Sequence, residues 1–259
     1  MPSIQITLVQ IDNYGPWTVT PAPRGEMDLQ TLQSRLYADL AGAVGTREGY
    51  LFYTRFDNMV AVTNGIDREA HRRIQESINT RYPVSVSVGV GTAASPAEAL
   101  GRATDRLQRA GSAQSTAREG ILDGEFLPEE DRGHRDVQVA HFDVVDSTSK
   151  YTDRVNAFDA HLAMEEAHLS LARHMREAHD SLSFFVGGDN VIAVCPDLDG
   201  DAFERAVEFV RDDVGVELQV GVGRAASASE AGMAAKHALE ECRHNGTRVE
   251  GTCEAVSSD

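Results

Sequence analysis

Cysteine and lysine are both scarce in this chain of 259 residues. The three cysteines, Cys195, Cys242 and Cys253, are scattered and form no C-x-x-C pair. This argues against both a disulfide framework and a structural zinc site, and it favours a reducing, cytoplasmic compartment. Lys150 and Lys236 are the lysines, and Asp plus Glu outnumber Lys plus Arg by 41 to 24, for a net charge of −17. Nucleic acid binding needs a basic surface, so this composition argues against it.

Long hydrophobic runs are also missing. No apolar stretch approaches the roughly 18 residues of a membrane-spanning helix, and the first residues lead directly into strand-like sequence. We therefore expect neither a membrane span nor a signal peptide. The lysine-poor acidic surface is typical of proteins that stay hydrated at high salt, and it predicts a halophilic archaeal source. An ordinary acidic protein is the alternative.

The chain contains an internal duplication. Residues 84–91 (VSVSVGVG) match residues 216–223 (VELQVGVG) at an offset of 132, and the match continues through the next seven residues. Further pairs follow at offsets of 132 or 131: Asp57 with Asp189, Asn58 with Asn190, and Asp12 with Asp143. Matches in the same order along both halves predict a tandem duplication.

Each copy is expected to follow the order βαββαβ with a trailing helix. Alternating apolar residues predict the strands, and apolar residues at helical spacing predict the helices. In the second copy the first helix presents the apolar face Phe158, Leu162, Leu169, Ala172 and Met175. The order predicts an α+β protein of two ferredoxin-like domains, each with one antiparallel sheet and its helices on one face. We assign residues 1–118 to the first domain, 119–135 to a polar linker, 136–250 to the second domain and 251–259 to a flexible tail.

A hairpin tip in the second copy is a candidate ligand site. Residues 187–190 (GGDN) separate two apolar runs, and the glycines permit positive φ and the close approach of another molecule. In this topology the first strand lies beside the hairpin, which brings Asp143 close to Asp189. Two carboxylates together with substrate phosphate oxygens suit Mg²⁺, so the pair predicts a magnesium–triphosphate site. A plain turn sequence is the alternative reading of the tip.

The residues that follow Asp143 predict a phosphate-binding turn. Residues 143–150 (DVVDSTSK) combine successive backbone amides with hydroxyls and a lysine, which suits phosphate. Asp146 and Ser147 suit helix caps equally well. The candidate substrate-binding residues here are Val144, Val145, Asp146, Ser147, Thr148 and Lys150, with Gly187, Gly188 and Asn190 at the hairpin; Val144 is also a candidate metal ligand.

The first copy keeps an acid pair, Asp12 and Asp57, but differs around it. Residues 13–21 (NYGPWTVTP) contain two prolines and are not expected to form a helix. Arg55-Phe56 replaces the glycine pair, so this copy is expected either to face a base or to supply charge to a phosphate held by the other copy. Trp17 suits core packing and base stacking equally. The candidates here are Asn13, Tyr14, Arg55, Phe56 and Asn58.

Two sets of motifs resemble known families. Residues 187–190 with residues 143–146 (DVVD) resemble the palm-type catalytic cores of GGDEF diguanylate cyclases and class III nucleotidyl cyclases. Residues 10–21 (QIDNYGPWTVTP), 55–58 (RFDN) and 185–190 (FVGGDN) together resemble the archaeal type III GTP cyclohydrolases, and this resemblance covers nearly the whole chain.

The cyclohydrolase resemblance implies a palm-type fold and a hydrolase of cyclic amidine C–N bonds, the GTP cyclohydrolase IIa activity. Such an enzyme opens the imidazole ring of GTP at C8 and releases two phosphates. Its product is 2-amino-5-formylamino-6-(5-phosphoribosylamino)pyrimidin-4(3H)-one, a riboflavin and deazaflavin precursor. The resemblance also implies Mg²⁺, assistance by a monovalent cation such as K⁺, and a homo-oligomer, either a dimer or a tetramer.

We interpret the four aspartates Asp12, Asp57, Asp143 and Asp189 as the functional acids, and Asn13, Asn58 and Asn190 as residues that position substrate or water. By analogy with the cyclases, Asn156 and Asp159 read the guanine edge. Two other functions stay open at this point. One is a nucleotidyl cyclase, which needs two metals at a paired acid site; the other is a nucleotide sensor without turnover.

Overall fold

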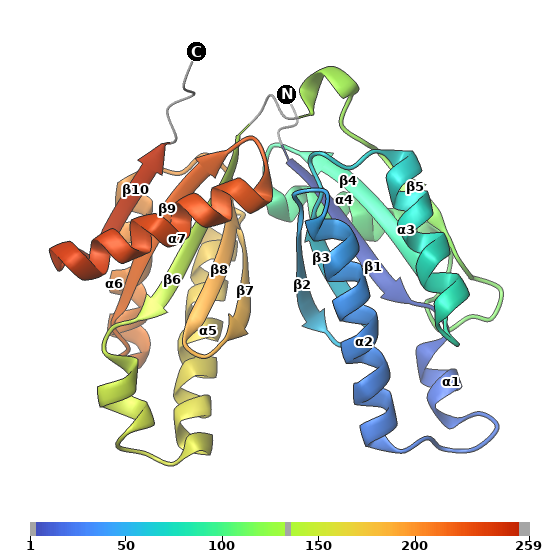
Figure 1. Cartoon of the computed structure of the whole chain (residues 1–259), viewed down its shortest axis with the longest axis horizontal. Helices are drawn as coiled ribbons and strands as arrows, with labels where there is room; N and C mark the ends of the chain where they lie inside the picture. Colours follow the sequence, from blue (N-terminus) through green and yellow to red (C-terminus); the bar gives the residue numbers. More distant parts are fainter. Residues whose placement is uncertain (1–3, 133–135, 254–259) are drawn as a thin grey trace. The chain divides into compact units, whose positions relative to one another are not determined.

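The computed structural model describes residues 4–132 and 136–253, which form two compact units (Figure 1). The first unit comprises residues 1–94 and 98–134, and the second comprises residues 95–97 and 135–259. Each unit is built on one five-stranded mixed sheet, in which the first strand of the repeat lies at the centre. The predicted α+β fold with duplicated βαββαβ order is confirmed.

The first unit has the sheet order β2-β3-β1-β4-β5. The central strand β1 pairs antiparallel with β3 on one side and with β4 on the other. In chain order its elements are β1 (Ile4–Ile11), α1 (Tyr14–Val19), α2 (Glu26–Gly45), β2 (Tyr50–Arg55), β3 (Asn58–Val62), α3 (Arg68–Arg81), β4 (Val86–Ala93), α4 (Pro96–Arg109), β5 (Leu122–Gly124) and the 3-10 turn η1 (Glu129–Asp131).

The second unit has the sheet order β10-β9-β6-β8-β7. Its central strand β6 pairs antiparallel with both β8 and β9. In chain order its elements are β6 (Val137–Val144), the π-helical turn η2 (Thr148–Thr152), α5 (Ala157–His179), β7 (Leu182–Gly187), β8 (Asn190–Cys195), α6 (Gly200–Val214), β9 (Leu218–Ala225), α7 (Ala228–Asn245) and β10 (Val249–Cys253).

The helices cover both faces of each sheet, whereas the sequence predicted helices on one face. Along β9, the side chains of Val220 and Val222 join the core that α5 and α6 cover. The glycine between them, Gly221, faces the other way, and a Cβ there would lie 2.1 Å from the Ala235 carbonyl oxygen of α7. Successive strand residues point to opposite faces, so α7 lies on the face opposite α5 and α6 (Figure 1). Gly89 and α4 have the same relationship in the first unit.

The predicted linker and tail both contribute strands. Residues Leu122–Gly124 pair in parallel with β4, and Leu127 is 1% exposed, so residues 119–132 belong to the first unit and are not a free linker. Residues Val249–Cys253 pair in parallel with β9, so the start of the predicted tail extends the second sheet. Residues 133–135 and 254–259 lie outside the described part of the chain. Short three- and five-residue strands at a sheet edge carry little periodic signal, which is why the sequence did not reveal them.

Two helix predictions were wrong. Residues Tyr14–Val19 form a short helix despite Pro16, because the first turn of a helix does not use its backbone N–H groups for internal bonds. In α5 the predicted apolar face is mostly solvent-exposed: Phe158, Leu162 and Leu169 are 67%, 46% and 50% exposed. Met175 of the predicted face is buried, and it packs in the core with Met164, Ala167 and Leu171, which were not assigned to that face.

Candidate functional site

Strand register brings the predicted acids of the second unit together. On the central strand β6, Asp143 lies opposite Asn190 of β8 and opposite Gln219 of β9. Asp189 precedes Asn190 in the turn that joins β7 to β8. The residues Asp143 and Asp189 therefore line the same hollow, as the topology predicted.

The Asp143 carboxylate is buried but keeps one oxygen open to a ligand. Its side chain is 6% exposed. Its Oδ2 accepts a hydrogen bond from Gln219 Nε2 at 2.9 Å and forms an ion pair with Arg243 Nη2 at 2.8 Å. Among the described residues, no donor contacts Oδ1. The carboxylate therefore has a lone pair available in the hollow while its charge is balanced by Arg243.

Asp189 is held by a short chain of polar contacts. Its Oδ2 accepts from the Ser147 hydroxyl, and its Oδ1 accepts from Asn190 Nδ2 at 3.0 Å. The Asn190 Oδ1 atom lies 2.8 Å from His141 Nε2, and burial lowers the pKa of His141, so the imidazole is neutral near pH 7. This chain fixes the orientation of the Asp189 carboxylate.

The two glycines before Asp189 have the backbone conformations that the sequence predicted. Gly187 and Gly188 have φ of +107° and +66°, which residues with a Cβ rarely adopt. The tip therefore combines a turn with an acid directed at the hollow, and the plain-turn reading does not account for the contact between Asp189 and Ser147.

The turn after β6 wraps the other side of the hollow. Asp146 has a left-handed φ of 57°, and Ser147 precedes η2 without forming a side-chain cap. The Ser147 hydroxyl binds Asp189 instead, so the cap interpretation of Ser147 is wrong. Lys150 Nζ lies 2.6 Å from Glu217 Oε2, and this contact raises the pKa of Lys150.

Three arginines that the sequence did not identify complete the hollow. It has a volume of about 880 Å³ and includes Arg211 from α6, Arg243 from α7 and Arg248 from the segment after α7. The hydrogen bond to Asp212 raises the pKa of Arg211, and the hydrogen bond to Asp143 raises the pKa of Arg243, so both are cationic. These arginines lie 65 to 105 residues from Asp143 or Asp146 in sequence, and no local motif marks them.

Asn156 and Asp159 are not part of this hollow. The Asn156 side chain caps α5: its Oδ1 accepts from the backbone N–H groups of Phe158 and Asp159 at 2.9 and 3.0 Å. Its Nδ2 donates to the Asp159 carboxylate. The Asn156 amide and one oxygen of the Asp159 carboxylate are thus engaged at the helix start, where Asn is a favoured cap.

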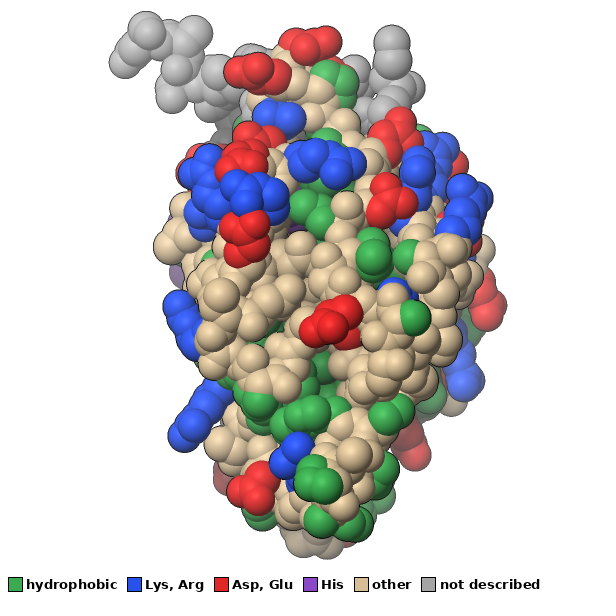
Figure 2. All heavy atoms as spheres, turned by 90° about the vertical axis from the view of Figure 1, so that its right-hand side faces the viewer, with side chains coloured by type: hydrophobic (Ala, Val, Ile, Leu, Met, Phe, Trp, Pro, Cys, Tyr) green, Lys and Arg blue, Asp and Glu red, His purple; other side chains and the backbone are tan. Residues whose placement is uncertain are grey.

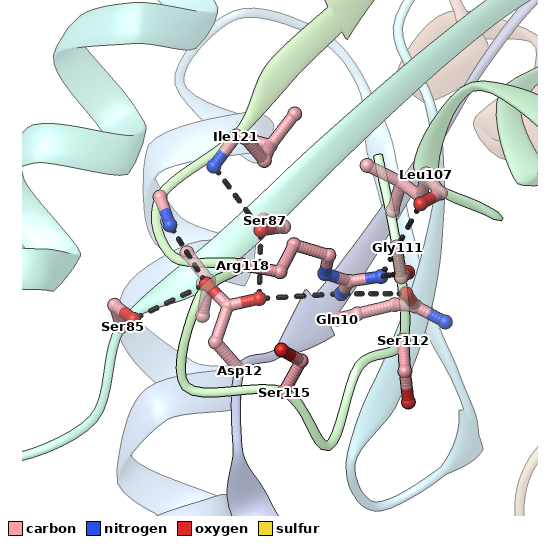
Figure 3. Close-up of polar contacts among 12 residues, drawn as sticks. Gln10, Asp12, Ser85, Ser87, Leu107, Gly111, Ser112, Ser115, Arg118 and Ile121 are labelled. Atoms are coloured by element: carbon pink, nitrogen blue, oxygen red, sulfur yellow. Dashed lines mark hydrogen bonds and ion pairs between the residues drawn. The ribbon is translucent and has the colours of Figure 1, made fainter. Parts of the chain in front are cut away.

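The corresponding acid of the first unit is sealed inside the protein (Figure 3). Asp12 Oδ1 accepts from Ser87 Oγ at 2.7 Å and from Arg118 Nη2 at 3.2 Å. Its Oδ2 accepts from Ser85 Oγ at 3.1 Å and from the Gly120 backbone N–H at 2.9 Å. Both oxygens are therefore occupied by protein donors. The small hollow beside Asp12 has a volume of about 190 Å³.

The hairpin tip of the first unit is exposed and forms local contacts. Arg55 Nη2 lies 3.0 Å from Asp57 Oδ2, and Asn58 Nδ2 donates to Asp57 Oδ1 at 2.8 Å. Phe56 is 54% exposed and packs on Tyr53, with ring centroids 4.8 Å apart. The backbone of β1 meets this tip, because the Ile11 N–H donates to the Asp57 carbonyl. No side-chain contact joins Asp12 and Asp57 among the described residues.

The aromatic residues of α1 stack on one another. The Tyr14 and Trp17 rings are 6.0 Å apart, and the Arg24 guanidinium lies over the Trp17 ring, 3.9 Å from its centroid. Tyr14 Oη accepts from Gln33 Nε2 at 2.8 Å. Figure 2 shows hydrophobic side chains gathered at this end of the first unit, where Figure 1 places α1. One buried atom, Asn13 Oδ1, has no hydrogen-bond partner in the described part of the chain.

Cysteine and histidine form no metal centre in the described ranges. Cys195 and Cys242 are buried free thiols. Within residues 4–132 and 136–253, no group of three or more His, Cys, Asp or Glu side chains is arranged to hold a metal ion. A cation at the second-unit hollow therefore needs ligands beyond Asp143 and Asp189. In the same ranges, no helix is both long and apolar enough to span a membrane.

Comparison with solved structures gives weak similarity to cyclases. The GGDEF domain of DgcB from Caulobacter crescentus in complex with c-di-GMP is 13% identical, with a TM-score of 0.39, and 45% of this chain and 77% of that chain are covered. A bacterial light-regulated adenylyl cyclase is 10% identical, with a TM-score of 0.39 and coverage of 96% and 85%. At such TM-scores the likeness carries no weight for function.

Sequence comparison is far more specific. The chain is 61% identical over 250 residues to a GTP cyclohydrolase III of Natronomonas pharaonis, covering 96% of this chain and 99% of the relative. It is 60% identical over 259 residues to that of Halorubrum lacusprofundi, with both chains fully covered. It is 46% identical over 246 residues to that of Methanococcus maripaludis, covering 94% and 90%. The family model for GTP cyclohydrolase III matches residues 4–257, and the chain therefore belongs to the GTP cyclohydrolase III family.

Proposed function

We propose that this protein hydrolyses GTP as a Mg²⁺-dependent cyclohydrolase of the IIa class, with the triphosphate bound in the second-unit hollow. Membership of the GTP cyclohydrolase III family supports GTP as the substrate and ring opening as the reaction. The proposed product is 2-amino-5-formylamino-6-(5-phosphoribosylamino)pyrimidin-4(3H)-one, formed with release of two phosphates. In this reaction water adds at C8, the C8–N9 bond breaks, and N9 takes a proton.

One observation carries the placement of the triphosphate. In a protein with a net charge of −17, Arg211, Arg243 and Arg248 converge on one hollow. Guanidinium groups match phosphate oxygens in shape and charge. The turn from Ser147 to Ser149 lines the same hollow, and the Thr148 hydroxyl there is a further candidate donor. The Asp12 hollow of the first unit is about a fifth as large and its acid is already fully paired, so it suits a triphosphate poorly.

The carboxylate oxygens that line the hollow are suitable ligands for a divalent cation bound together with substrate. Asp143 Oδ1 lacks a donor among the described residues, and Asp189 faces the same hollow. Mg²⁺ prefers one or two carboxylates with phosphate oxygens and water completing its shell, which agrees with the absence of a fuller ligand cluster in the described ranges. When bound, Mg²⁺ supplies charge neutralisation at the phosphates and activation of water. The chain's own part is to hold Asp189 in place through Ser147, Asn190 and His141.

Several finer assignments stay predictions. We propose catalytic roles for two acids of the first unit, Asp12 and Asp57. We also propose an assisting monovalent cation, and substrate contacts from Asn13, Tyr14, Arg55, Phe56 and Asn58. We also propose that the chain forms a homo-oligomer, a dimer or a tetramer. The exposed apolar residues Phe158, Leu162 and Leu169 along α5 support an interface there. Light-scattering mass measurement of the wild type and of Leu162→Glu tests the assembly.

The decisive experiment follows GTP with Mg²⁺ by ultraviolet absorbance and by phosphate release. Loss of the purine band with two phosphates per GTP is the expected result. Pyrophosphate with an intact purine would identify a nucleotidyl cyclase, and an unchanged spectrum would identify a sensor; either overturns the proposal. Asp189→Ala should abolish turnover and leave the fold intact, since a hairpin-tip acid packs against little. Glu166→Ala, an exposed acid on α5, is the matched control and should keep full turnover.

A further inference from the structure

Arg243 is the cation that balances Asp143, and it is far more exposed than its partner. Arg243 lies in the last turn of α7. Its Nη2 is 2.8 Å from Asp143 Oδ2, and its Nη1 is 2.5 Å from Glu240 Oε1. The Arg243 side chain is 43% exposed, whereas the Asp143 side chain is 6% exposed. A buried carboxylate is thus paired with a cation that can leave toward solvent without moving the backbone.

The first unit balances its equivalent acid in a different way. Asp12 and Arg118 have side chains that are 1% and 2% exposed. Arg118 also donates to Gln10 Oε1 at 2.9 Å and to the Gly111 carbonyl, so it is fixed from several sides (Figure 3). At the repeat offset of 132, the residue that matches Arg243 is Gly111, not Arg118. The two units therefore place a guanidinium at the equivalent acid from unrelated positions, fully buried in one unit and partly exposed in the other.

Arg243 opposes the binding of a metal ion at Asp143. Oδ2 already accepts from both Gln219 and Arg243, which occupies the two lone pairs of a carboxylate oxygen, so a metal ion is left with Oδ1. A divalent cation at the same carboxylate would also be repelled by a guanidinium a few ångströms away. Phosphate oxygens offer the guanidinium an alternative partner of the same charge-assisted, bidentate kind.

We propose that Arg243 acts as a placeholder cation: it occupies Asp143 in the empty protein and moves to the nucleotide phosphates when the metal–nucleotide complex binds. The consequence is selectivity for the metal–nucleotide complex over the free metal ion, since free Mg²⁺ must either bind at Oδ1 against the repulsion of Arg243 or displace Arg243 without giving it a new partner. Arg243 is a positioning residue in this role. The inference rests on the proposed placement of Mg²⁺ and triphosphate at Asp143.

The test measures metal binding without turnover. Free Mg²⁺ is titrated into wild type and Arg243→Ala by calorimetry, in the absence of nucleotide. Arg243→Ala should bind free Mg²⁺ about tenfold more tightly, equivalent to about 1.4 kcal/mol. The same variant should bind a non-hydrolysable GTP analogue with Mg²⁺ at least tenfold more weakly. Arg248→Ala, which lies in the same hollow but pairs with Glu208, should lose nucleotide affinity without any gain in affinity for free Mg²⁺.

Unchanged or weaker binding of free Mg²⁺ by Arg243→Ala would overturn the placeholder role. Should Arg243→Ala fail to fold, Arg243→Gln decides, because Gln keeps a donor for Asp143 without the charge and should also gain affinity for Mg²⁺. Failure of the proposed function looks different: wild type would then leave GTP intact whatever the metal affinities of the variants.

Discussion

Asp12 and Arg118 form an ion pair with 3.2 Å between Oδ1 and Nη2, and both side chains are almost fully buried. Arg118 comes from the segment after α4 that the sequence suggested was near a domain boundary. The pair therefore ties this segment to the central strand of the first sheet. Breaking one member of a buried pair leaves an uncompensated charge, which typically costs about 3–5 kcal/mol.

We expect Arg118→Met to lower the free energy of unfolding by about 3 kcal/mol or more, because Asp12 is left buried without its cation. Urea unfolding of wild type and variant measures the loss. The double variant Asp12→Asn with Arg118→Met should recover part of it. If Asp12→Asn unfolds like wild type but has no GTP turnover, then Asp12 is a functional acid, as the sequence motif suggested, and not a structural one.

Loss of the contact between Ser147 and Asp189 is expected to lower kcat/KM without lowering the stability of the fold. Ser147→Ala removes the hydroxyl that binds Asp189 Oδ2, and we expect a loss of about tenfold in kcat/KM, equivalent to about 1.4 kcal/mol. Steady-state kinetics with GTP measures it. Ser149→Ala is the comparison, because its hydroxyl contacts the Asp146 carbonyl and not Asp189. Equal losses in both variants would argue against a positioning role for Ser147.

His71 predicts a loss of stability in mild acid. Its Nδ1 donates to the Asp67 carbonyl at 2.8 Å, so the neutral ring accepts from Thr7 Oγ1 through Nε2 at the same distance. Burial lowers the pKa of His71 to about 4. The unfolded chain binds this proton near pH 6.5, so the free energy of unfolding should fall as the pH drops from about 6.5 toward 4. The full shift corresponds to about 3 kcal/mol.

Urea titrations at a series of pH values measure this dependence. Carboxylates also titrate toward pH 4, so the comparison is between wild type and His71→Gln, whose curve should be flatter across this window. The exposed His161→Gln is the control and should keep the wild-type slope. A wild-type slope in His71→Gln would assign the acid sensitivity to other groups.

Close packing of α7 on β9 predicts that Gly223 tolerates no side chain. A Cβ on Gly223 would lie 2.2 Å from the Ala231 carbonyl oxygen and 2.3 Å from the Ala235 nitrogen. These are backbone atoms, so the helix itself must shift, and we expect Gly223→Ala to cost about 1–3 kcal/mol of unfolding free energy. Gly200→Ala, with no atom near its added Cβ, should be neutral or stabilising. Thermal unfolding of both variants distinguishes the outcomes.

The net charge of −17 predicts salt dependence. At millimolar salt the carboxylates repel one another over long distances, whereas molar salt shortens the screening length to about 3 Å. We expect Tm to rise by more than about 5 °C from millimolar to molar KCl. An identical Tm at both concentrations would contradict the halophilic interpretation of the surface.

The sequence alone was enough to predict the duplicated fold and to place acids on the central strand and at the hairpin tip of the second unit. Periodicity and repeated motifs are local signals, and the βαββαβ order places its first strand beside the hairpin in any such sheet. Helix α5 carries apolar residues on two sides, one that includes Leu162 and one that includes Leu171. Helical periodicity alone did not show which side faces the sheet, and only the packing in the structure shows that the side with Leu171 is buried.

The charge balance around the acids was decided only by tertiary structure. Arg243 reaches Asp143 across 100 residues of chain, and Arg118 reaches Asp12 across 106. Neither belongs to a motif, and the two do not correspond in the repeat. A guanidinium on a long side chain can pair with any acid that the fold brings within reach, so its partner depends on distances in space that no local pattern records.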